Sequence, residues 1–296
     1  MRKRAVAYCV TGPHIQLAAV SIASIIEHYQ DVMPLDILVV VNELGNEEIL
    51  KLKNISKLYR KMNVSINIWY PPEITKQIKN YSNTRFPEVT LWRLFLPSYF
   101  SNYEHILYLD NDTIVYDDVS NFFDLIPDEK AIAAVRDFYF SVVSATEDSF
   151  KYFGVRTMKN YFNSGVILFN VAIFNDLIRP EDIVSMINTN EYLYLDQTIL
   201  NIFCEKSVEL LPYEYNYQKD DHWLFDWAKN VNPLKFLEIE RARENVKVRH
   251  FVEFDKNSMP WEHLSIRDCW EKDFWSYLNT IKLLSLKEEE KNEKNL

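Results

Sequence analysis

Apolar runs of strand length alternate with helical patterns along the first part of this 296-residue chain. The expected strands are residues 4–10, 35–41, 64–69 and 106–109, and the expected helices are residues 17–28, 47–59 with Asn46 as N-cap, and 88–100. Parallel strands need a long crossover connection, which is usually a helix. The alternation therefore predicts an α/β fold, a Rossmann-like and mostly parallel sheet covered by helices.

The fourth expected strand ends abruptly in two acidic residues. The apolar run 106–109 is followed by Asp110, Asn111 and Asp112. Asp and Asn are poor strand residues, so the strand should stop there and present both carboxylates at its carboxyl end, where open α/β sheets bind ligands. Two close carboxylates repel each other unless a proton or a cation lies between them. The pair therefore predicts a divalent cation, Mn²⁺ or Mg²⁺, with phosphate oxygens completing its coordination.

Composition narrows the classes of function that fit this chain. The formal net charge of −10 argues against general nucleic-acid binding, which needs a basic surface. The chain has four glycines and carries neither a GxGxxG nor a Walker A sequence. Any phosphate must therefore be held by a metal ion, by side chains or by a helix N-terminus.

The sequence gives no sign of a membrane anchor or a secretion signal. An apolar run of about 18 residues is absent, and residues 5–10 are interpreted as a core strand rather than as part of a signal peptide. Cys9, Cys204 and Cys269 are far apart and show neither disulfide nor zinc spacing, which is typical of a reduced compartment. We expect a cytoplasmic protein without a transmembrane segment, either free or docked at the inner face of the membrane.

One main domain is expected, because the chain has no internal repeat and no Gly/Ser linker. It should cover residues 1–261, and a C-terminal helix and charged tail should cover residues 262–296. The aromatic face of that helix, expected over residues 266–286, should pack into the core. The oligomeric state is left open.

Polar residues interrupt later strands or open later helices. In chain order they are Asp137, Asn163, Ser164, Asp196, Gln197 and His250. The strands concerned are expected at residues 131–135, 162–169 and 246–251, the second of them broken at residues 163–165, and the helix that begins at Asp196 should end at residue 203. Each polar residue has a structural alternative: a cap or turn for the aspartates, a bulge for the Asn-Ser pair, and a core position for the histidine. Because His is a good ligand for Mn²⁺ beside two carboxylates, His250 is a candidate third metal ligand.

Several motifs taken together resemble the family 8 glycosyltransferases, which include bacterial lipopolysaccharide galactosyl- and glucosyltransferases and the glycogenins. The motifs are, in collinear order, WRLFLPSYFSNYEHILYLDNDTIV, YFNSGVILFN, LDQTILN, LPYEYNY, and VRHF followed by a Pro-Trp pair. The resemblance covers residues 4 to 261. It implies a GT-A fold, a UDP-sugar donor, a Mn²⁺ ion and transfer of a hexose with retention to a glycan, glycolipid or glycoprotein acceptor.

The resemblance also implies roles for individual residues. Asp110, Asp112 and His250 match the metal ligands, and Asp110 would also contact the donor ribose. Asp196 and Gln197 match the acid-amide pair beside the anomeric carbon and are the catalytic candidates. The substrate-binding set that the resemblance implies is Cys9, Thr11, His14, Arg93, Asp110, Asn111, Asp137, Asn163, Ser164 and Lys256. Arg93 could instead be a surface helix arginine, although its sequence neighbours are apolar.

Two segments depart from the family pattern. The loop after the first strand, Thr11 to His14, lacks the aspartate that reads the nucleotide base in many members, and His14 falls where a ring often stacks on uracil. The family ending His, Gly, then Lys-Pro-Trp is altered, since Met259 precedes the proline. Lys256 would then supply the positive charge for the diphosphate from a longer loop.

Two other functions are alternatives to hexose transfer. The Asp110-Asn111-Asp112 run resembles the Asp-x-Asp-x-Thr motif of haloacid-dehalogenase-like phosphatases, but Ile114 occupies the position of the threonine and the motif normally follows the first strand. A non-catalytic sugar-nucleotide-binding protein of the same fold is the other alternative.

Overall fold

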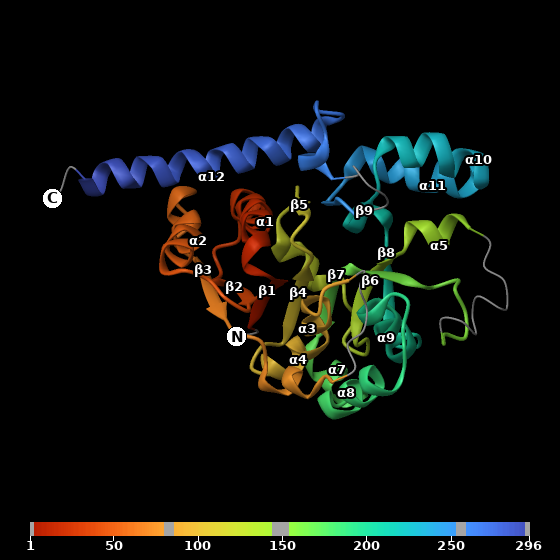
Figure 1. Cartoon of the computed structure of the whole chain (residues 1–296). Helices are drawn as coiled ribbons and strands as arrows, with labels where there is room; N and C mark the ends of the chain where they lie inside the picture. Colours follow the sequence, from red (N-terminus) through yellow and green to blue (C-terminus); the bar gives the residue numbers. More distant parts are fainter. Residues whose placement is uncertain (1–2, 80–85, 144–153, 253–258, 294–296) are drawn as a thin grey trace.

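A seven-stranded sheet forms the middle of the protein (Figure 1). The computed structural model describes residues 3–79, 86–143, 154–252 and 259–293, and it describes side chains up to residue 282. The strand order is β3-β2-β1-β4-β7-β6-β8. The strands are β1 Arg4–Val10, β2 Leu35–Val41, β3 Val64–Trp69, β4 His105–Leu109, β6 Ile132–Arg136, β7 Phe162–Asn170 and β8 Val208–Leu211. The four strands expected before residue 110 are therefore confirmed.

The sheet is mostly parallel, as predicted. β1 runs parallel to β2 and β4, β2 to β3, and β6 to β8, whereas β7 is antiparallel to both of its neighbours. Every residue of β7 is buried, as expected for a strand whose two faces are both covered. The parallel strands β1 and β4 therefore present their carboxyl ends at one edge of the sheet.

Helices cover both faces of the sheet. On one face, α1 (Ile15–His28) and α2 (Asn46–Leu58) pack against strand residues such as Tyr8 and Val39. On the other face lie α3 (Val89–Trp92), α4 (Leu96–Tyr99), α7 (Val171–Leu177), α8 (Pro180–Thr189) and α9 (Leu195–Cys204). Alternate residues of each strand supply the two cores, because successive side chains point to opposite faces.

A small sheet of order β5-β10-β9 stands beside the carboxyl ends of the main strands. Its strands are β5 Thr113–Val115, β9 Tyr217–Gln218 and β10 Val248–His250. β10 pairs antiparallel with β5, which sets His250 opposite Thr113, and parallel with β9, which sets His250 beside Gln218. This sheet therefore brings the far end of the chain to the turn that carries Asp110 and Asp112.

Helices from the last third of the chain cover the small sheet (Figure 1). They are α11 Pro233–Ala242 and α12 Cys269–Glu293, and the short helix α10 Lys229–Val231 precedes α11. Trp270, Phe274 and Leu278 of α12 are buried, so the predicted core face of the terminal helix is confirmed. No described helix combines the length and the apolar composition that a bilayer span requires. The short elements are η1 Gly12–His14, η2 Glu73–Gln77, η3 Arg93–Phe95, η4 Val119–Asp124, α5 Phe138–Val142, η5 Tyr213–Asn216, the π-helical turn Trp223–Ala228, η7 Arg243–Asn245 and η8 Pro260–Glu262.

Three local predictions are wrong. The helix expected over residues 88–100 is divided into α3, η3 and α4, because Pro97 has no N–H to donate to the Arg93 carbonyl, and the Leu96 N–H bonds that carbonyl instead. Asn46 is the first residue of α2 rather than its cap. The N-cap is Gly45, whose N–H donates to the Glu48 carboxylate at 2.8 Å.

The third wrong prediction is the break in the strand that carries Asn163, Ser164 and Gly165. β7 is continuous through these residues, and only its pairing with β6 shifts register there. The bulge that the sequence suggested therefore exists as a register shift, within an unbroken strand.

Candidate functional site

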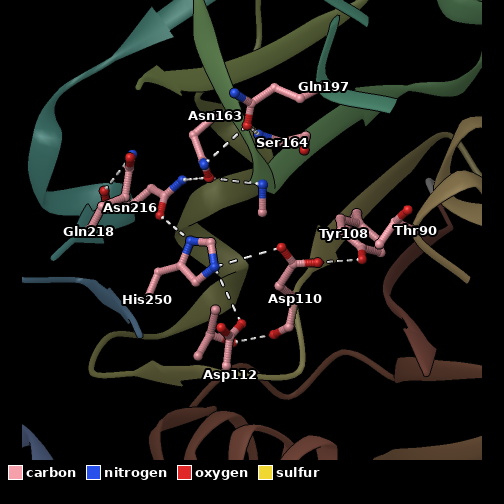
Figure 2. Close-up of polar contacts among 12 residues, drawn as sticks. Thr90, Tyr108, Asp110, Asp112, Asn163, Ser164, Gln197, Asn216, Gln218 and His250 are labelled. Atoms are coloured by element: carbon pink, nitrogen blue, oxygen red, sulfur yellow. Dashed lines mark hydrogen bonds and ion pairs between the residues drawn. The ribbon is translucent and has the colours of Figure 1, made fainter. Parts of the chain in front are cut away.

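The turn between β4 and β5 carries two carboxylates that face one histidine (Figure 2). His250 Nε2 lies 3.3 Å from Asp112 Oδ1 and 3.6 Å from Asp110 Oδ2. Ligand atoms of the three residues all lie within 4.8 Å of one another. His250 is 3% exposed, so its ring is fixed by packing rather than by solvent contacts. The structure thus brings together the three residues predicted to bind a metal.

Buried hydroxyl groups hold this turn in place. Thr113 donates its hydroxyl to the Asp110 carbonyl at 2.9 Å, and the same hydroxyl lies 2.7 Å from Ser21 Oγ of α1. Ser21 in turn lies 2.8 Å from the Tyr8 hydroxyl of β1. The Asp112 carbonyl accepts the N–H of the residue that follows β10 at 2.9 Å. Contacts to α1, β1 and β10 therefore fix both acids relative to His250.

Arg93 connects the first acid to a second acidic residue. Its Nη2 lies 2.9 Å from Asp110 Oδ1 and its Nε lies 3.3 Å from Asp196 Oδ2. The Tyr108 hydroxyl also donates to Asp110 Oδ1, at 2.6 Å, so this oxygen is engaged and Oδ2 faces His250. Arg93 is 4% exposed, and the interpretation as a surface arginine is therefore wrong.

Burial and neighbouring charges have opposite effects on the pKa values of Arg93 and Asp196. Burial alone lowers the pKa of Arg93, but the charges of Asp110 and Asp196 outweigh it and hold that pKa above its ordinary value. Burial raises the pKa of Asp196, although Arg93 and a hydrogen bond from Ser164 act in the opposite direction. Asp196 is not the N-cap of α9, since that position belongs to Tyr194, so its alternative role as a cap is excluded.

A second cluster consists of amide and hydroxyl groups on β7 and α9. Gln197 Oε1 accepts hydrogen bonds from Asn163 Nδ2 at 3.2 Å and from the Ser164 N–H at 3.1 Å. The Ser164 hydroxyl donates to Asp196 Oδ2 at 2.8 Å, and Gln197 Nε2 donates to Asp137 Oδ2 at 3.3 Å. Asp137 is also the N-cap of α5. The predicted catalytic pair therefore lies against the polar residues of β7.

One cavity of about 500 Å³ joins the two clusters. Of the predicted site residues, those that line it are Arg93, Asp110, Asp112, Asp137, Asn163, Ser164, Asp196, Gln197 and His250. Residues that the sequence did not single out also line it: Phe86, Thr90, Tyr139, Phe140, Tyr194, Lys219, Val252 and Met259. No motif pointed to the four aromatic residues among them, because a cavity ring and a core ring look alike in the sequence, and Met259 was noted only for preceding the proline. Lys219 has a positive φ of 66° and is 8% exposed, features that the sequence does not reveal.

Other predicted residues lie elsewhere or outside the described part of the chain. Thr11 and His14 follow β1 and bond each other, with Thr11 Oγ1 2.8 Å from His14 Nδ1. Cys9 is buried at the end of β1, where burial raises the pKa of its thiol. Neither these residues nor Asn111 line the cavity. Lys256 lies outside the described residues, so its predicted role stays a prediction.

The triad fits a divalent cation. Carboxylate oxygens suit Mg²⁺ and Mn²⁺, and an imidazole nitrogen favours Mn²⁺ of the two. The second nitrogen of His250, Nδ1, lies 3.0 Å from Asn216 Oδ1, and outer contacts of this kind orient metal-binding histidines. The residues present can therefore hold the predicted ion.

Comparison with known proteins gives consistent results. The family model described as "Glycosyl transferase family 8" matches residues 5–265. A putative glycosyltransferase of Haemophilus influenzae is 26% identical over 220 residues, which are 73% of this chain and 63% of that protein. Glycosyltransferase GlyB of Streptococcus pneumoniae is 33% identical over 198 residues, 64% of this chain and 41% of its own length. The chain thus spans less than two thirds of the length of these relatives.

Solved structures share the fold. The bifunctional glycosyltransferase WbbM superposes with a TM-score of 0.78 at 22% identity, over 94% of this chain and 49% of that one. An active-site mutant of LgtC superposes with a TM-score of 0.72 at 18% identity, over 93% of this chain and 95% of that one. The mostly parallel sheet with flanking helices is thus the GT-A fold that the sequence predicted.

Proposed function

The chain belongs to glycosyl transferase family 8, and from this premise we propose that it transfers a hexose, glucose or galactose, from a UDP-sugar to a glycan, glycolipid or glycoprotein acceptor with retention. We propose that transfer depends on a divalent cation, Mn²⁺ or Mg²⁺. The observation that carries the proposal is the convergence of Asp110, Asp112 and His250 within 4.8 Å at the cavity that also holds Gln197.

The metal ligands are prepared by their neighbours. Arg93 and Tyr108 occupy Asp110 Oδ1, which leaves Oδ2 for the ion. When bound, the ion supplies Lewis-acid stabilisation of the charge that develops on the leaving diphosphate. Asp112 and His250 would supply the other protein ligands of the ion. Arg93, a buried and permanent cation, pairs with Asp110 at 2.9 Å and so fixes the orientation of its carboxylate.

The polar groups around Asp196 and Gln197 favour same-face attack over a covalent intermediate. A covalent route requires a free carboxylate below the anomeric carbon, and Asp196 is the only candidate that the sequence offered. Its Oδ2 is engaged by both Arg93 and Ser164, and its side chain is buried, which makes it a poor nucleophile. We propose that Gln197, held by three polar neighbours, stabilises the cation-like transition state, while a leaving-phosphate oxygen takes the proton of the acceptor hydroxyl.

The order of the strands suggests how the substrates lie. Thr11 and His14 follow β1, the metal ligands Asp110 and Asp112 follow β4, and Asp137 follows β6 on the far side of β7. We propose that the nucleotide lies toward β1 and the acceptor toward β6 and α5. Phe140 and Tyr194 meet edge to face there, with centroids 5.6 Å apart, and such rings stack readily on sugars.

The test is a UDP-release assay with UDP-glucose, UDP-galactose, UDP-GlcNAc and UDP-GalNAc, with Mn²⁺ or Mg²⁺, against a panel of glycan, glycolipid and glycoprotein acceptors. Metal-dependent release with one donor supports the proposal. Tight UDP–Mn²⁺ binding without release on any acceptor supports the binding-only alternative, and absence of both refutes a sugar-nucleotide site. A cytoplasmic location is part of the proposal, and the free cysteines Cys9, Cys204 and Cys269 support it.

A further inference from the structure

Asn216 joins the two polar clusters of the site and lies at the end of η5, just before β9 (Figure 2). Its side chain is fully buried, at 0% exposure. Its Nδ2 donates to Asn163 Oδ1 at 3.0 Å, and its Oδ1 lies 3.0 Å from His250 Nδ1. One amide therefore contacts both a candidate metal ligand and a residue that bonds Gln197.

The hydrogen-bond network determines which nitrogen of His250 carries a proton. The Gly165 backbone N–H, which can only donate, bonds the Asn163 side chain at 3.0 Å, so the Asn163 atom there must be the oxygen. The Asn216 group that bonds this same oxygen must then be its NH₂. The remaining Asn216 atom, its oxygen, faces His250 Nδ1, which must therefore be protonated.

With a proton on Nδ1, Nε2 is the ring nitrogen that can act as a metal ligand, because a nitrogen binds a metal ion only through a free lone pair. Nε2 faces Asp110 Oδ2 and Asp112 Oδ1, so the three candidate ligand atoms converge on one point. A cation bound there would be held by all three residues. Asn216 thus presents His250 in the tautomer that a metal ion requires.

The NH₂ group of Asn216 orients the second cluster, the amide and hydroxyl groups on β7 and α9. Because Asn163 Oδ1 is held by both Asn216 and Gly165, the Asn163 NH₂ must point the other way, and it donates to Gln197 Oε1 at 3.2 Å. Gln197 is thereby oriented with its own NH₂ toward Asp137. The direction of every amide in this chain of contacts follows from the backbone N–H of Gly165.

We propose that Asn216 is a positioning residue for sugar transfer, one that sets the tautomer of His250 through its oxygen and the orientation of Asn163 and Gln197 through its NH₂. The inference rests on the proposed function, because it assigns Asn216 to the same metal site. Asparagine suits this position because its amide accepts with the oxygen on one side and donates with the NH₂ on the other.

Two substitutions separate the two hydrogen bonds of the Asn216 amide, the one to His250 and the one to Asn163. Asn216→Leu removes both hydrogen bonds at similar volume, and loss of an outer partner of a metal ligand typically weakens metal affinity by about 10–100-fold. Asn216→Asp keeps an acceptor for His250 Nδ1 but loses the donor to Asn163, so Mn²⁺ affinity should stay within a few-fold of wild type. kcat at saturating Mn²⁺ and donor should nevertheless fall, because Asn163 no longer holds Gln197.

The matched control is Asn170→Leu. Asn170 is a buried asparagine at the opposite end of β7 that donates to the Asp128 carbonyl at 3.1 Å and caps α7. Its loss should lower stability without changing Mn²⁺ affinity. Mn²⁺ binding is measured by electron paramagnetic resonance of the free ion without nucleotide, stability by urea unfolding, and the His250 tautomer by ¹⁵N–¹H spectra of imidazole-labelled wild-type protein, assigned with His250→Gln.

The outcomes are distinct. Weaker Mn²⁺ binding by Asn216→Leu alone, with a proton on Nδ1 in the wild type, supports the inference. The inference would be overturned by wild-type Mn²⁺ affinity in Asn216→Leu, by an equal loss of Mn²⁺ affinity in Asn216→Leu and Asn216→Asp, or by a neutral His250 ring with its proton on Nε2. If Asn216→Leu does not fold, the spectra and Asn216→Asp decide. A wild-type protein that binds no Mn²⁺ refutes the metal part of the proposed function itself.

Discussion

The close approach of β7 to the metal ligands makes Gly165 the most sensitive backbone position of the site. A Cβ added at Gly165 would lie 2.1 Å from His250 Cε1 and 2.7 Å from Asp110 Oδ2. Ordinary contact begins at 3.4 Å, so the ring would have to withdraw by roughly 1.3 Å (3.4 − 2.1) in a close-packed interior. Gly165→Ala therefore displaces one metal ligand directly and presses on a second.

Two magnitudes follow for Gly165→Ala. Overpacking of this kind typically costs about 1–3 kcal/mol of unfolding free energy. Metal–ligand distances tolerate only about 0.2 Å, so the shift of His250 should weaken Mn²⁺ binding by at least ~100-fold, or about 2.7 kcal/mol. The loss of affinity should exceed what the lower stability explains, because the folded fraction stays near one in the absence of urea.

Urea unfolding and Mn²⁺ titration, followed by the resonance of the free ion, measure these two effects of Gly165→Ala. The control is Gly45→Ala, whose Cβ would meet only the flexible end of the Glu48 side chain at 3.3 Å. It should leave Mn²⁺ affinity unchanged and cost about 1 kcal/mol of unfolding free energy, because alanine is a poorer N-cap than glycine. A Gly165→Ala protein that binds Mn²⁺ within two-fold of wild type would refute the reasoning, since β7 would then not constrain the ligands.

Three other substitutions test the charges of the site. Asp112→Asn should abolish metal-dependent UDP release while leaving the urea midpoint almost unchanged, because Asp112 lies at a turn; near-normal release would contradict its role as a ligand. Arg93→Met should lower the unfolding free energy by about 3–5 kcal/mol, since it strands two carboxylates, and a loss below about 1 kcal/mol would show that these acids need no buried cation. Asp196→Asn tests the raised pKa of Asp196: that carboxyl binds its proton more tightly when folded, so its contribution to stability is present at low pH and declines as the pH rises from about 4 through the folded pKa. Wild type should therefore lose stability relative to Asp196→Asn over that range in urea titrations, and a constant or opposite difference would exclude the assignment.

Local patterns predicted the fold well and its interruptions badly. The strands at residues 4–10, 35–41 and 64–69 agree with the structure to the residue. The first two are largely apolar runs, the pattern of a strand buried on both faces, whereas residues 64–69 alternate and bury mainly one face. The helix expected over residues 88–100 failed at Pro97, where one missing N–H divides it and leaves Arg93 in a 3₁₀ turn. That irregular turn carries a side chain that the site uses.

The site divides in the same way between what is local and what is not. Asp110 and Asp112 end a strand, and their spacing alone predicted a cation. That His250 meets them depends on β10 pairing with β5, and that Arg93 reaches Asp110 depends on burial across two elements. Asn216 carried no signal beyond its place in a motif, since its function lies in two contacts to residues 53 and 34 positions away.

The sequence by itself determined the alternation of strands and helices, the two acids at a strand end, and through its ordered motifs the family. The tertiary structure alone decided which nitrogen of His250 faces the acids, which oxygen of Asp110 is left for an ion, and which rings line the cavity. The physical reason is the separation along the sequence of the residues that interact. Periodicity and turn chemistry act between residues a few positions apart, whereas the site is assembled by strand pairing and buried hydrogen bonds between residues far apart in the chain.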